Sequence, residues 1–293
     1  MKIEAVLSPA ELPVLAKRDL RDVVCVVFDV LRATSTFVTA LHHGANAIVP
    51  VSEIAEALAL RRRQPDVLLG GERDGVRIRA AQTGGVDFNL GNSPREYTPE
   101  KVRGKTIVST TTNGTRALRA CAGAKTVLAA SFLNLAATAG FVQKLHPAEL
   151  LLVCAGTGEN VAPEDVLAAG ALAEMLANEP VAQHLKVGRA VPCPPRNEAS
   201  IPVHQPSHGA HGVTRPTFSD SAATARNAWR KAKDNLAITI AEAENARRLL
   251  AIPELHDDVA FCLQRDVFNL TTGLDSSGAI RMFGEFLISL PRP

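Results

Sequence analysis

VVCVVFDVLRATST, residues 23–36, is the stretch that decides the fold. It starts as an apolar, mostly β-branched run, reaches Asp29, and then passes through a polar turn into a helical pattern. Two later stretches share this layout, KTIVSTTTNGTRAL (105–118) and ELLLVCAGTGENVAPEDVLAAG (149–170). Strands this apolar are typical of sheets that helices cover on both faces. The repeated layout therefore predicts an α/β fold.

Strand and helix patterns also alternate along the rest of the chain. We expect further strands at 47–51, 66–70 and 126–130, and helices at 52–63, 133–145, 164–178 and 220–250. The predicted fold class is α/β, with a mostly parallel sheet core flanked by helices and two lobes around a cleft. We divide the chain into an α/β lobe with the main motifs (1–178), a Pro- and His-rich insertion or loop (179–219), and a long helix with a C-terminal α/β portion that completes the cleft (220–293).

Composition excludes several classes of protein. The 293 residues are 46% apolar and 21% charged, and a net charge of +2 is too balanced for a nucleic-acid binder. The five cysteines are odd in number and lack CxxC spacing, which favours a reducing cytosol. The N-terminus does not resemble a signal peptide, and no apolar run of about 20 residues is present. We expect a cytoplasmic protein without a membrane partner.

The stretch 191–219 departs from the alternating pattern. It contains six prolines and three histidines without periodicity, so we interpret it as a long exposed loop or insertion. The histidines, His204, His208 and His211, have short spacing that could suit Zn²⁺, but a solvated loop is the better interpretation. The segment after it has the pattern of one long amphipathic helix that carries Trp229.

The turn after the first apolar strand offers the groups that phosphoryl transfer needs. Asp29 ends the strand, Arg32 follows it, and Thr34 and Ser35 lead into the helix. A carboxylate can hold a divalent cation, a guanidinium can bind phosphate oxygens, and a helix N-terminus attracts anions. The alternative is that a hydroxyl caps the helix while Asp29 and Arg32 form a surface pair.

Two further turns could bind an anion. Glycines surround Glu72 and Arg73 in GGERDG (70–75), and Asn92 and Ser93 lie in the later turn DFNLGNSP, where an ordinary turn is the alternative. The turn after the strand at 105–109 supplies hydroxyls, an amide and backbone N–H groups, for which the alternative is helix capping. Its candidate residues are Thr112, Asn113, Gly114, Thr115 and Arg116.

The fourth turn contains Gly156, and the helix after it begins with Pro163, Glu164 and Asp165. Proline and acids in a first helical turn are also what capping favours, so both acids could be structural. Near the C-terminus we expect a strand flanked by Asp258 and Asp266, either of which could line the cleft, with Asp257 in solvent.

Several standard signatures are absent from the sequence. It has no GxGxxG motif, which disfavours a Rossmann dinucleotide site, and GAKT at 123–126 lacks the Gly-Lys-Ser/Thr of a Walker A loop. Asp29-Val30-Leu31 lacks the second aspartate of a DxD motif, which disfavours a covalent aspartyl-phosphate route.

Four motifs in order resemble those of the 2-phosphosulfolactate phosphatase family. They are DVLRATST, GGER with DG and the following DFNLGNSP, STTTNGTRAL, and CAGTGENVAPEDVLAAG, and together they cover roughly residues 1–178. The resemblance implies an α/β fold and a Mg²⁺-dependent hydrolase that converts 2-phospho-3-sulfolactate to 3-sulfolactate and phosphate, a step toward coenzyme M. The sequence departs from the family at 180–219 and in DFNLGNSP, where a Gly-Phe-Asp type of sequence is expected.

The residues and the resemblance lead to one functional hypothesis. Asp29, Arg32, Glu164 and Asp165 are the candidate catalytic residues, and we expect Asp29 with Glu164 or Asp165 to bind Mg²⁺. Arg32, Arg73 and Arg116 would bind the acid groups of a small phosphorylated acid. The alternatives are a phosphatase for another small acidic phosphoester and a non-catalytic binder of an anionic metabolite. A homodimer is one option for the assembly.

Overall fold

The computed structural model describes residues 1–178 and 215–283. Most of the predicted insertion at 179–219, its three histidines included, therefore lies outside the described residues. The strands are β1 (Lys2–Val6), β2 (Val23–Phe28), β3 (Ala47–Pro50), β4 (Leu68–Arg73), β5 (Val76–Arg77), β6 (Thr106–Thr110), β7 (Thr126–Ala130), β8 (Glu149–Cys154), β9 (Thr217–Phe218), β10 (Thr271–Leu274) and β11 (Ile280–Phe283).

The helices are α1 (Leu12–Leu15), α2 (Ala33–His42), α3 (Ile54–Arg63), α4 (Ala80–Thr83), α5 (Pro99–Val102), α6 (Gly114–Ala120), α7 (Leu135–Leu145), α8 (Pro163–Ala177), α9 (Asp220–Ala232), α10 (Leu236–Ala241), α11 (Glu244–Leu250) and α12 (His256–Cys262), with 3₁₀ turns at Pro9–Glu11, Pro94–Glu96 and Phe132–Asn134. Helices alternate with strands from β1 to α8, as the sequence predicts, whereas α9 to α12 follow one another directly.

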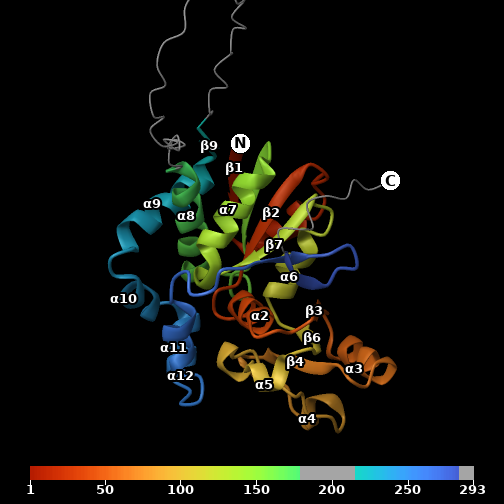
Figure 1. The fold of residues 1–293 in the computed structure, drawn as a ribbon. Coiled ribbons are helices and arrows are strands. Elements are labelled where there is room, and N and C mark those ends of the chain that lie inside the picture. Colours follow the sequence, from red (N-terminus) through yellow and green to blue (C-terminus); the bar gives the residue numbers. More distant parts are fainter. Residues whose placement is uncertain (179–214, 284–293) are drawn as a thin grey trace, which may run out of the picture.

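One sheet connects the described strands in the order β5-β4-β6-β3-β11-β10-β7-β2-β8-β1-β9. It contains two parallel groups, β7-β2-β8-β1-β9 and β4-β6-β3, and the hairpin β10-β11 joins them through antiparallel pairs. The predicted α/β class with a mostly parallel sheet is confirmed. Figure 1 shows the first group in the upper part of the molecule and the second in the lower part.

The two parallel groups run in opposite senses, because three antiparallel pairs separate β7 from β3. In a flat sheet, their carboxyl ends would lie at opposite edges. Five steps separate β2 from β6 in the strand order, and a twist of about 20–25° per step rotates them by roughly 100–125° relative to each other. This rotation allows turns from both groups to meet.

The alternation of side chains on β2 explains why the strand is apolar throughout. Val24, Val26 and Phe28 pack in one cluster with residues of α7, α8 and α9. Val23, Cys25 and Val27 pack in another with residues of α1, α2 and α6. All six residues of β2 are buried, so the turn after it starts from a fixed backbone. A smaller cluster that includes Ala57 and Val108 packs α3 against the second group of strands.

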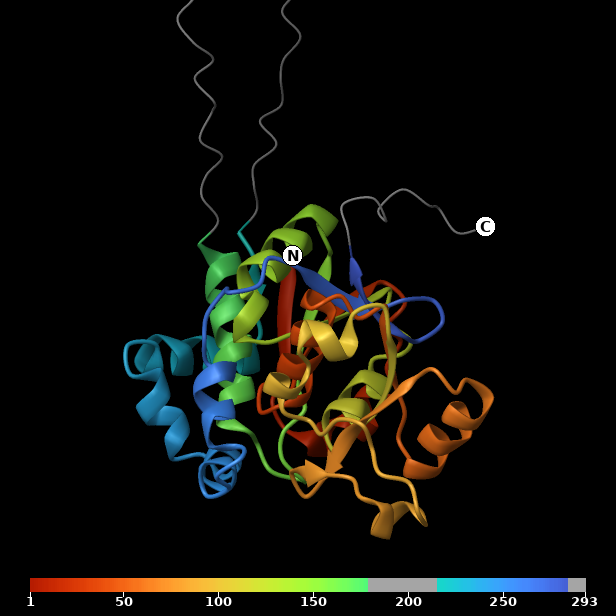
Figure 2. The same ribbon diagram turned by 60° about the horizontal axis from the view of Figure 1, so that its bottom comes forward.

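Two predictions about the C-terminal part are wrong. The stretch 220–250 forms three helices, α9, α10 and α11, with breaks at Lys233–Asn235 and Glu242–Ala243. The expected strand between Asp258 and Asp266 is instead the helix α12, in which 258, 259 and 262 are buried with helical spacing. Figure 2 shows α9 to α12 (cyan to blue) on the left and the region from β3 to α4 (orange) on the right. No helix in residues 1–178 and 215–283 is long and apolar enough to cross a membrane.

Candidate active site

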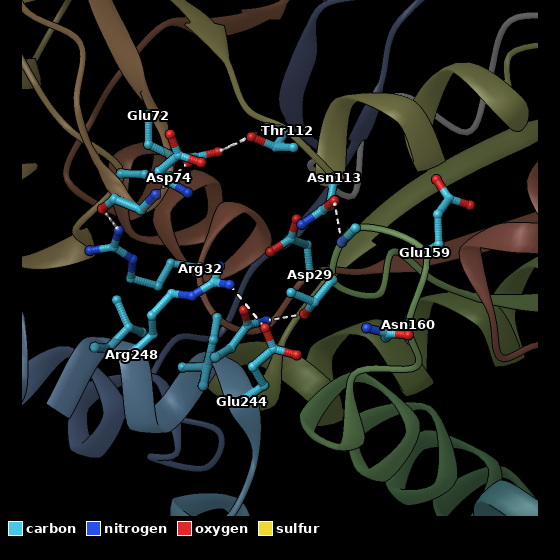
Figure 3. A pocket seen from close by; sticks show the side chains of 17 residues that line it. Asp29, Arg32, Glu72, Asp74, Thr112, Asn113, Glu159, Asn160, Glu244 and Arg248 are labelled. Carbon is cyan, nitrogen blue, oxygen red and sulfur yellow. Dashed lines mark hydrogen bonds and ion pairs between the residues drawn. The ribbon is translucent and has the colours of Figure 1, made fainter. Parts of the chain in front are cut away.

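The turns that follow β2, β4, β6 and β8 line one pocket of about 290 Å³, and α11 closes it from another side. Figure 3 shows these side chains around the pocket. The lining residues are Asp29, Leu31, Arg32, Glu72, Asp74, Gly75, Asn92, Thr112, Asn113, Thr157, Gly158, Glu159, Asn160, Glu244, Asn245, Arg248 and Leu249. Polar turns that are far apart in the sequence thus meet at one pocket.

Asp29 is a buried acid of this pocket, with 7% of its surface exposed. Its Oδ1 accepts a hydrogen bond from the N–H of Ala33 at 3.0 Å, at the start of α2. Gly114 lies against its other oxygen, because a Cβ added at Gly114 would be 2.8 Å from Oδ2. Asp29 is therefore packed between the first turns of α2 and α6, and no larger residue fits at Gly114.

The electrostatic surroundings of Asp29 oppose its ionisation. Burial is the main cause that raises the pKa of Asp29, to about 7; repulsion from Glu72 and Glu164 contributes to this rise, and hydrogen bonds from the N–H groups of Ala33 and Gly114 oppose it. A cation bound beside these carboxylates would reverse the effect, because it favours the charged form of each acid.

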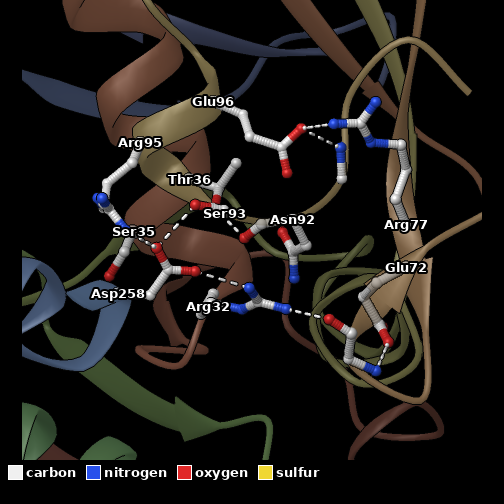
Figure 4. Close-up of polar contacts among 12 residues, drawn as sticks. Arg32, Ser35, Thr36, Glu72, Arg77, Asn92, Ser93, Arg95, Glu96 and Asp258 are labelled. Atoms are coloured by element: carbon white, nitrogen blue, oxygen red, sulfur yellow. Dashed lines mark hydrogen bonds and ion pairs between the residues drawn. The ribbon is translucent and has the colours of Figure 1, made fainter. Parts of the chain in front are cut away.

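Arg32 lies in the wall of the pocket and is 3% exposed. Its Nη1 donates to Oδ2 of Asp258 at 2.7 Å, and its Nη2 donates to the carbonyl oxygen of Gly75. Asp258 on α12 is fully buried and also accepts a hydrogen bond from the hydroxyl of Ser93 at 2.7 Å. Figure 4 shows this network, in which Asp258 connects Arg32 to the turn before α5. The guanidinium is therefore fixed by two acceptors.

Asp165 accepts backbone hydrogen bonds at both of its oxygens. Oδ1 accepts from Val30 N–H at 2.8 Å, and Oδ2 accepts from Gly156 N–H at 3.0 Å. Burial raises its pKa well above the usual range, and repulsion from Asp29 and Glu164 raises it further. The carboxyl group thus links the turn after β2 to the turn after β8.

Glu164 differs from its neighbour in having one oxygen without a partner. Its Oε1 accepts from Nδ2 of Asn245 at 2.9 Å, whereas its Oε2 is buried and has no hydrogen-bond partner among the described residues. Burial raises the pKa of this side chain as well, although the Asn245 amide acts in the other direction. An unpartnered buried carboxylate oxygen is costly, and a bound cation would satisfy it.

Glu72 connects the second group of strands to the turn after β6. Its Oε1 accepts from the N–H and the hydroxyl of Thr112, at 2.8 and 3.0 Å, and its Oε2 accepts from Gly75 N–H at 2.8 Å. Gly71 allows β4 to pair closely with β6, since a Cβ there would be 2.1 Å from the carbonyl oxygen of Thr110.

The other predicted residues divide between the pocket wall and its support. Asn92 and Asn113 line the pocket with Asp29, Arg32, Glu72 and Thr112. Thr34 and Ser35 donate to the carbonyl oxygens of Asp29 and Val30 and are fully buried.

Three other predicted residues, Arg73, Thr115 and Arg116, do not themselves line the pocket. Arg73 donates to Thr110 and to backbone carbonyls, and the hydroxyls of Thr115 and Thr111 lie 3.2 Å apart. Arg116 pairs at 3.1 Å with the exposed Glu159. Their roles in substrate binding stay predictions.

Sequence reasoning expected the segment 220–293 to complete the cleft but named none of the α11 residues that line the pocket. The pocket is lined by four residues of α11, namely Glu244, Asn245, Arg248 and Leu249. In the sequence, their spacing is that of one face of an ordinary solvated helix. Thr157 and Asn160 were also missed, although they follow β8 in the same turn as the chosen Gly156. Their position directly after a strand end was a signal that could have identified them.

Comparison with known families shows to which family this chain belongs. The sequence model of 2-phosphosulpholactate phosphatase matches residues 10–276. The chain belongs to the 2-phosphosulfolactate phosphatase family. All of the residues that line the pocket, from Asp29 to Leu249, fall within the part that matches this family of phosphatases.

Individual relatives agree with the family assignment. The chain is 36% identical over 249 residues to a "Probable 2-phosphosulfolactate phosphatase" of Thermotoga maritima, and the alignment covers 85% of this chain and 88% of the relative. A protein of the same name from Pseudothermotoga lettingae is 34% identical over 248 residues, with 84% and 87% covered. One from Caldanaerobacter subterraneus is 45% identical over 161 residues, which are 54% of this chain and 64% of the relative. The chain thus matches less than two thirds of that last relative.

Proposed function

We propose that this protein hydrolyses 2-phospho-3-sulfolactate to 3-sulfolactate and phosphate in a Mg²⁺-dependent reaction, as a step on a route to coenzyme M. The observation that carries the proposal is the position of Asp29. It is a buried carboxylate at a strand end, in a pocket whose lining residues all fall within the part of the chain that matches the family.

The acidic groups fit a magnesium ion. Mg²⁺ is often held by one or two carboxylates together with water and substrate phosphate oxygens. Asp29 and Glu164 are two such carboxylates. Repulsion from Glu164 contributes to the raised pKa of Asp29, and Oε2 of Glu164 is buried without a hydrogen-bond partner among the described residues. In residues 1–178 and 215–283, no group of three or more His, Cys, Asp or Glu side chains is arranged to hold a metal. We therefore assign Asp29 and Glu164 as the protein ligands and give Asp165, whose oxygens accept backbone N–H groups, a supporting role.

When bound, Mg²⁺ supplies positive charge to the phosphate oxygens during phosphoryl transfer. The chain itself supplies the position of the other groups. Arg32 has five N–H donors, and Asp258 and Gly75 fix its plane while leaving donors for phosphate oxygens. Glu72 holds the turn at Thr112 and Asn113 in place, so that the polar atoms of this turn face the same pocket.

The direct test is release of phosphate from 2-phospho-3-sulfolactate by the purified full-length protein, with and without Mg²⁺. We expect turnover that stops after treatment with EDTA and returns when Mg²⁺ is added. Full turnover after exhaustive chelation would contradict the metal requirement. Tight binding without turnover would support a non-catalytic binder, and faster hydrolysis of another phosphorylated acid in a panel would assign a different substrate.

A further inference from the structure

Two arginines line the pocket among the described residues, and their surroundings differ. Arg32 is buried and already paired with the fully buried Asp258. The side chain of Arg248 is 55% exposed, and its Nη2 is 2.9 Å from Oε1 of Glu244, one turn earlier on α11. An exposed pair with this spacing is weak, because water screens both charges. Arg248 can therefore exchange its partner at little cost.

The charges of the pocket create a need for such a cation. Its lining contains more carboxylates than guanidinium groups: Asp29, Glu72, Asp74, Glu159 and Glu244 against Arg32 and Arg248. The proposed substrate carries a phosphate, a carboxylate and a sulfonate. A metal ion at Asp29 would balance the phosphate, whereas the two other acid groups would lie close to carboxylates unless a further cation meets one of them.

The position of Arg248 is set by its neighbour Asn245. The amide of Asn245 donates to Oε1 of Glu164 at 2.9 Å and to the hydroxyl of Thr157. These bonds attach α11 to the turn after β8 and to the start of α8. Arg248 lies three residues after Asn245 and hence on the same face of the helix. Figure 3 shows Arg248 and Glu244 on the side of the pocket away from Thr112 and Asn113.

We propose that Arg248 determines substrate specificity: its guanidinium leaves Glu244 and binds one of the acid groups that do not react, the carboxylate or the sulfonate. This inference rests on the proposed function, since it concerns the substrate of the same pocket. A planar guanidinium can bind two oxygens of either group at once, which an ammonium cannot do.

The test compares Arg248→Met with the wild type on three substrates: 2-phosphosulfolactate, 2-phospholactate, which lacks the sulfonate, and the phosphate ester of 2-hydroxyethanesulfonate, which lacks the carboxylate. Loss of a charge-assisted contact should raise KM for 2-phosphosulfolactate about 10-fold with kcat little changed. The substrate that lacks the contacted group should show a change of less than about twofold. The shorter substrate whose KM does not change on substitution lacks the group that Arg248 binds.

Two further variants control for charge and for folding. Arg247→Met removes a neighbouring arginine that lies outside the pocket lining and should leave all three KM values unchanged. Arg248→Lys should recover only part of the affinity, because lysine keeps the charge but lacks the planar pair of N–H donors that can bind two oxygens at once. An equal rise in KM for all three substrates, an unchanged KM, or a loss confined to kcat would overturn the proposal.

Calorimetric titration of 3-sulfolactate separates this inference from the proposed function, because it needs no turnover. If the wild-type protein hydrolyses none of the substrates, the proposed reaction fails. Weaker binding of 3-sulfolactate to Arg248→Met, by about 10-fold, would still support the anion contact. Equal binding to both proteins, or no binding to either, would overturn it.

Discussion

The pocket has two walls of different construction. In the wall formed by the strand ends, Asp29 and Glu72 are buried, and backbone N–H groups donate to their oxygens. In the wall formed by α11, Arg248 and Glu244 are about half exposed and pair with each other. Groups held by several backbone bonds have a fixed position, as chemistry at a phosphorus atom requires. Side chains with weak exposed partners can instead adjust to a ligand. The difference suggests that the first wall performs the reaction and the second recognises the substrate.

The substitution expected to have the largest effect is Asp29→Asn. It removes the charge that would bind a cation while it keeps the shape of the side chain, so kcat should fall by about 100-fold or more. The measurement is kcat for 2-phosphosulfolactate at saturating Mg²⁺, with Asp257→Asn as a control, because Asp257 is an exposed acid outside the pocket lining. Normal turnover by Asp29→Asn would show that the strand-end wall does not perform the chemistry.

Asp165→Asn should act on stability more than on metal binding. The amide NH₂ would face either Val30 N–H or Gly156 N–H, so one buried donor would lose its acceptor at a cost of about 2–3 kcal/mol. Denaturant unfolding measures this loss, and the Mg²⁺ concentration for half-maximal activity should stay within about twofold of wild type. Unchanged stability together with a much higher Mg²⁺ requirement would instead make Asp165 a metal ligand.

The smallest of these effects is expected for Arg32→Lys. Lysine keeps the charge, but its ammonium group cannot donate hydrogen bonds to Asp258, Gly75 and a phosphate oxygen in the planar geometry of a guanidinium. We therefore expect kcat/KM to fall by about 10-fold. Activation by Mg²⁺ should hardly change, because a cation contributes no metal ligand. A selective shift in the Mg²⁺ requirement would indicate that Arg32 orients a metal-binding carboxylate, and unchanged kinetics would remove it from phosphate binding.

The first wall could be predicted from sequence because its determinants are local. An apolar run, a strand end and a polar turn are adjacent in the chain, as at 23–36, and parallel strands bring such turns together. The apolar spacing of 220–250 also predicts helix correctly, but the stretch contains no glycine or proline to indicate the two breaks.

Other parts of the site depend on contacts between distant parts of the chain, which no local pattern reports. The apolar residues from Val259 to Leu263 suit a strand as well as a helix, and only the partners of Asp258 on other elements show which face is buried. The two oxygens of Asp165 give a second example. From the sequence alone, an acid in the first turn of a helix suggests capping or metal binding. Its hydrogen bonds with Val30 and Gly156 can be recognised only once the fold is known.

The pair between Arg32 and Asp258 joins residues 226 positions apart in the chain. During synthesis at about 5–20 residues per second, roughly 10–45 s pass between the two residues leaving the site of peptide bond formation. In this interval the nascent chain can form β1 to β8, but Arg32 has no buried partner until α12 is made, and the hairpin β10-β11 that joins the two groups of strands follows later still. The activity that we propose would then require α12, because the guanidinium of Arg32 in the pocket wall takes its final position only when this helix has packed.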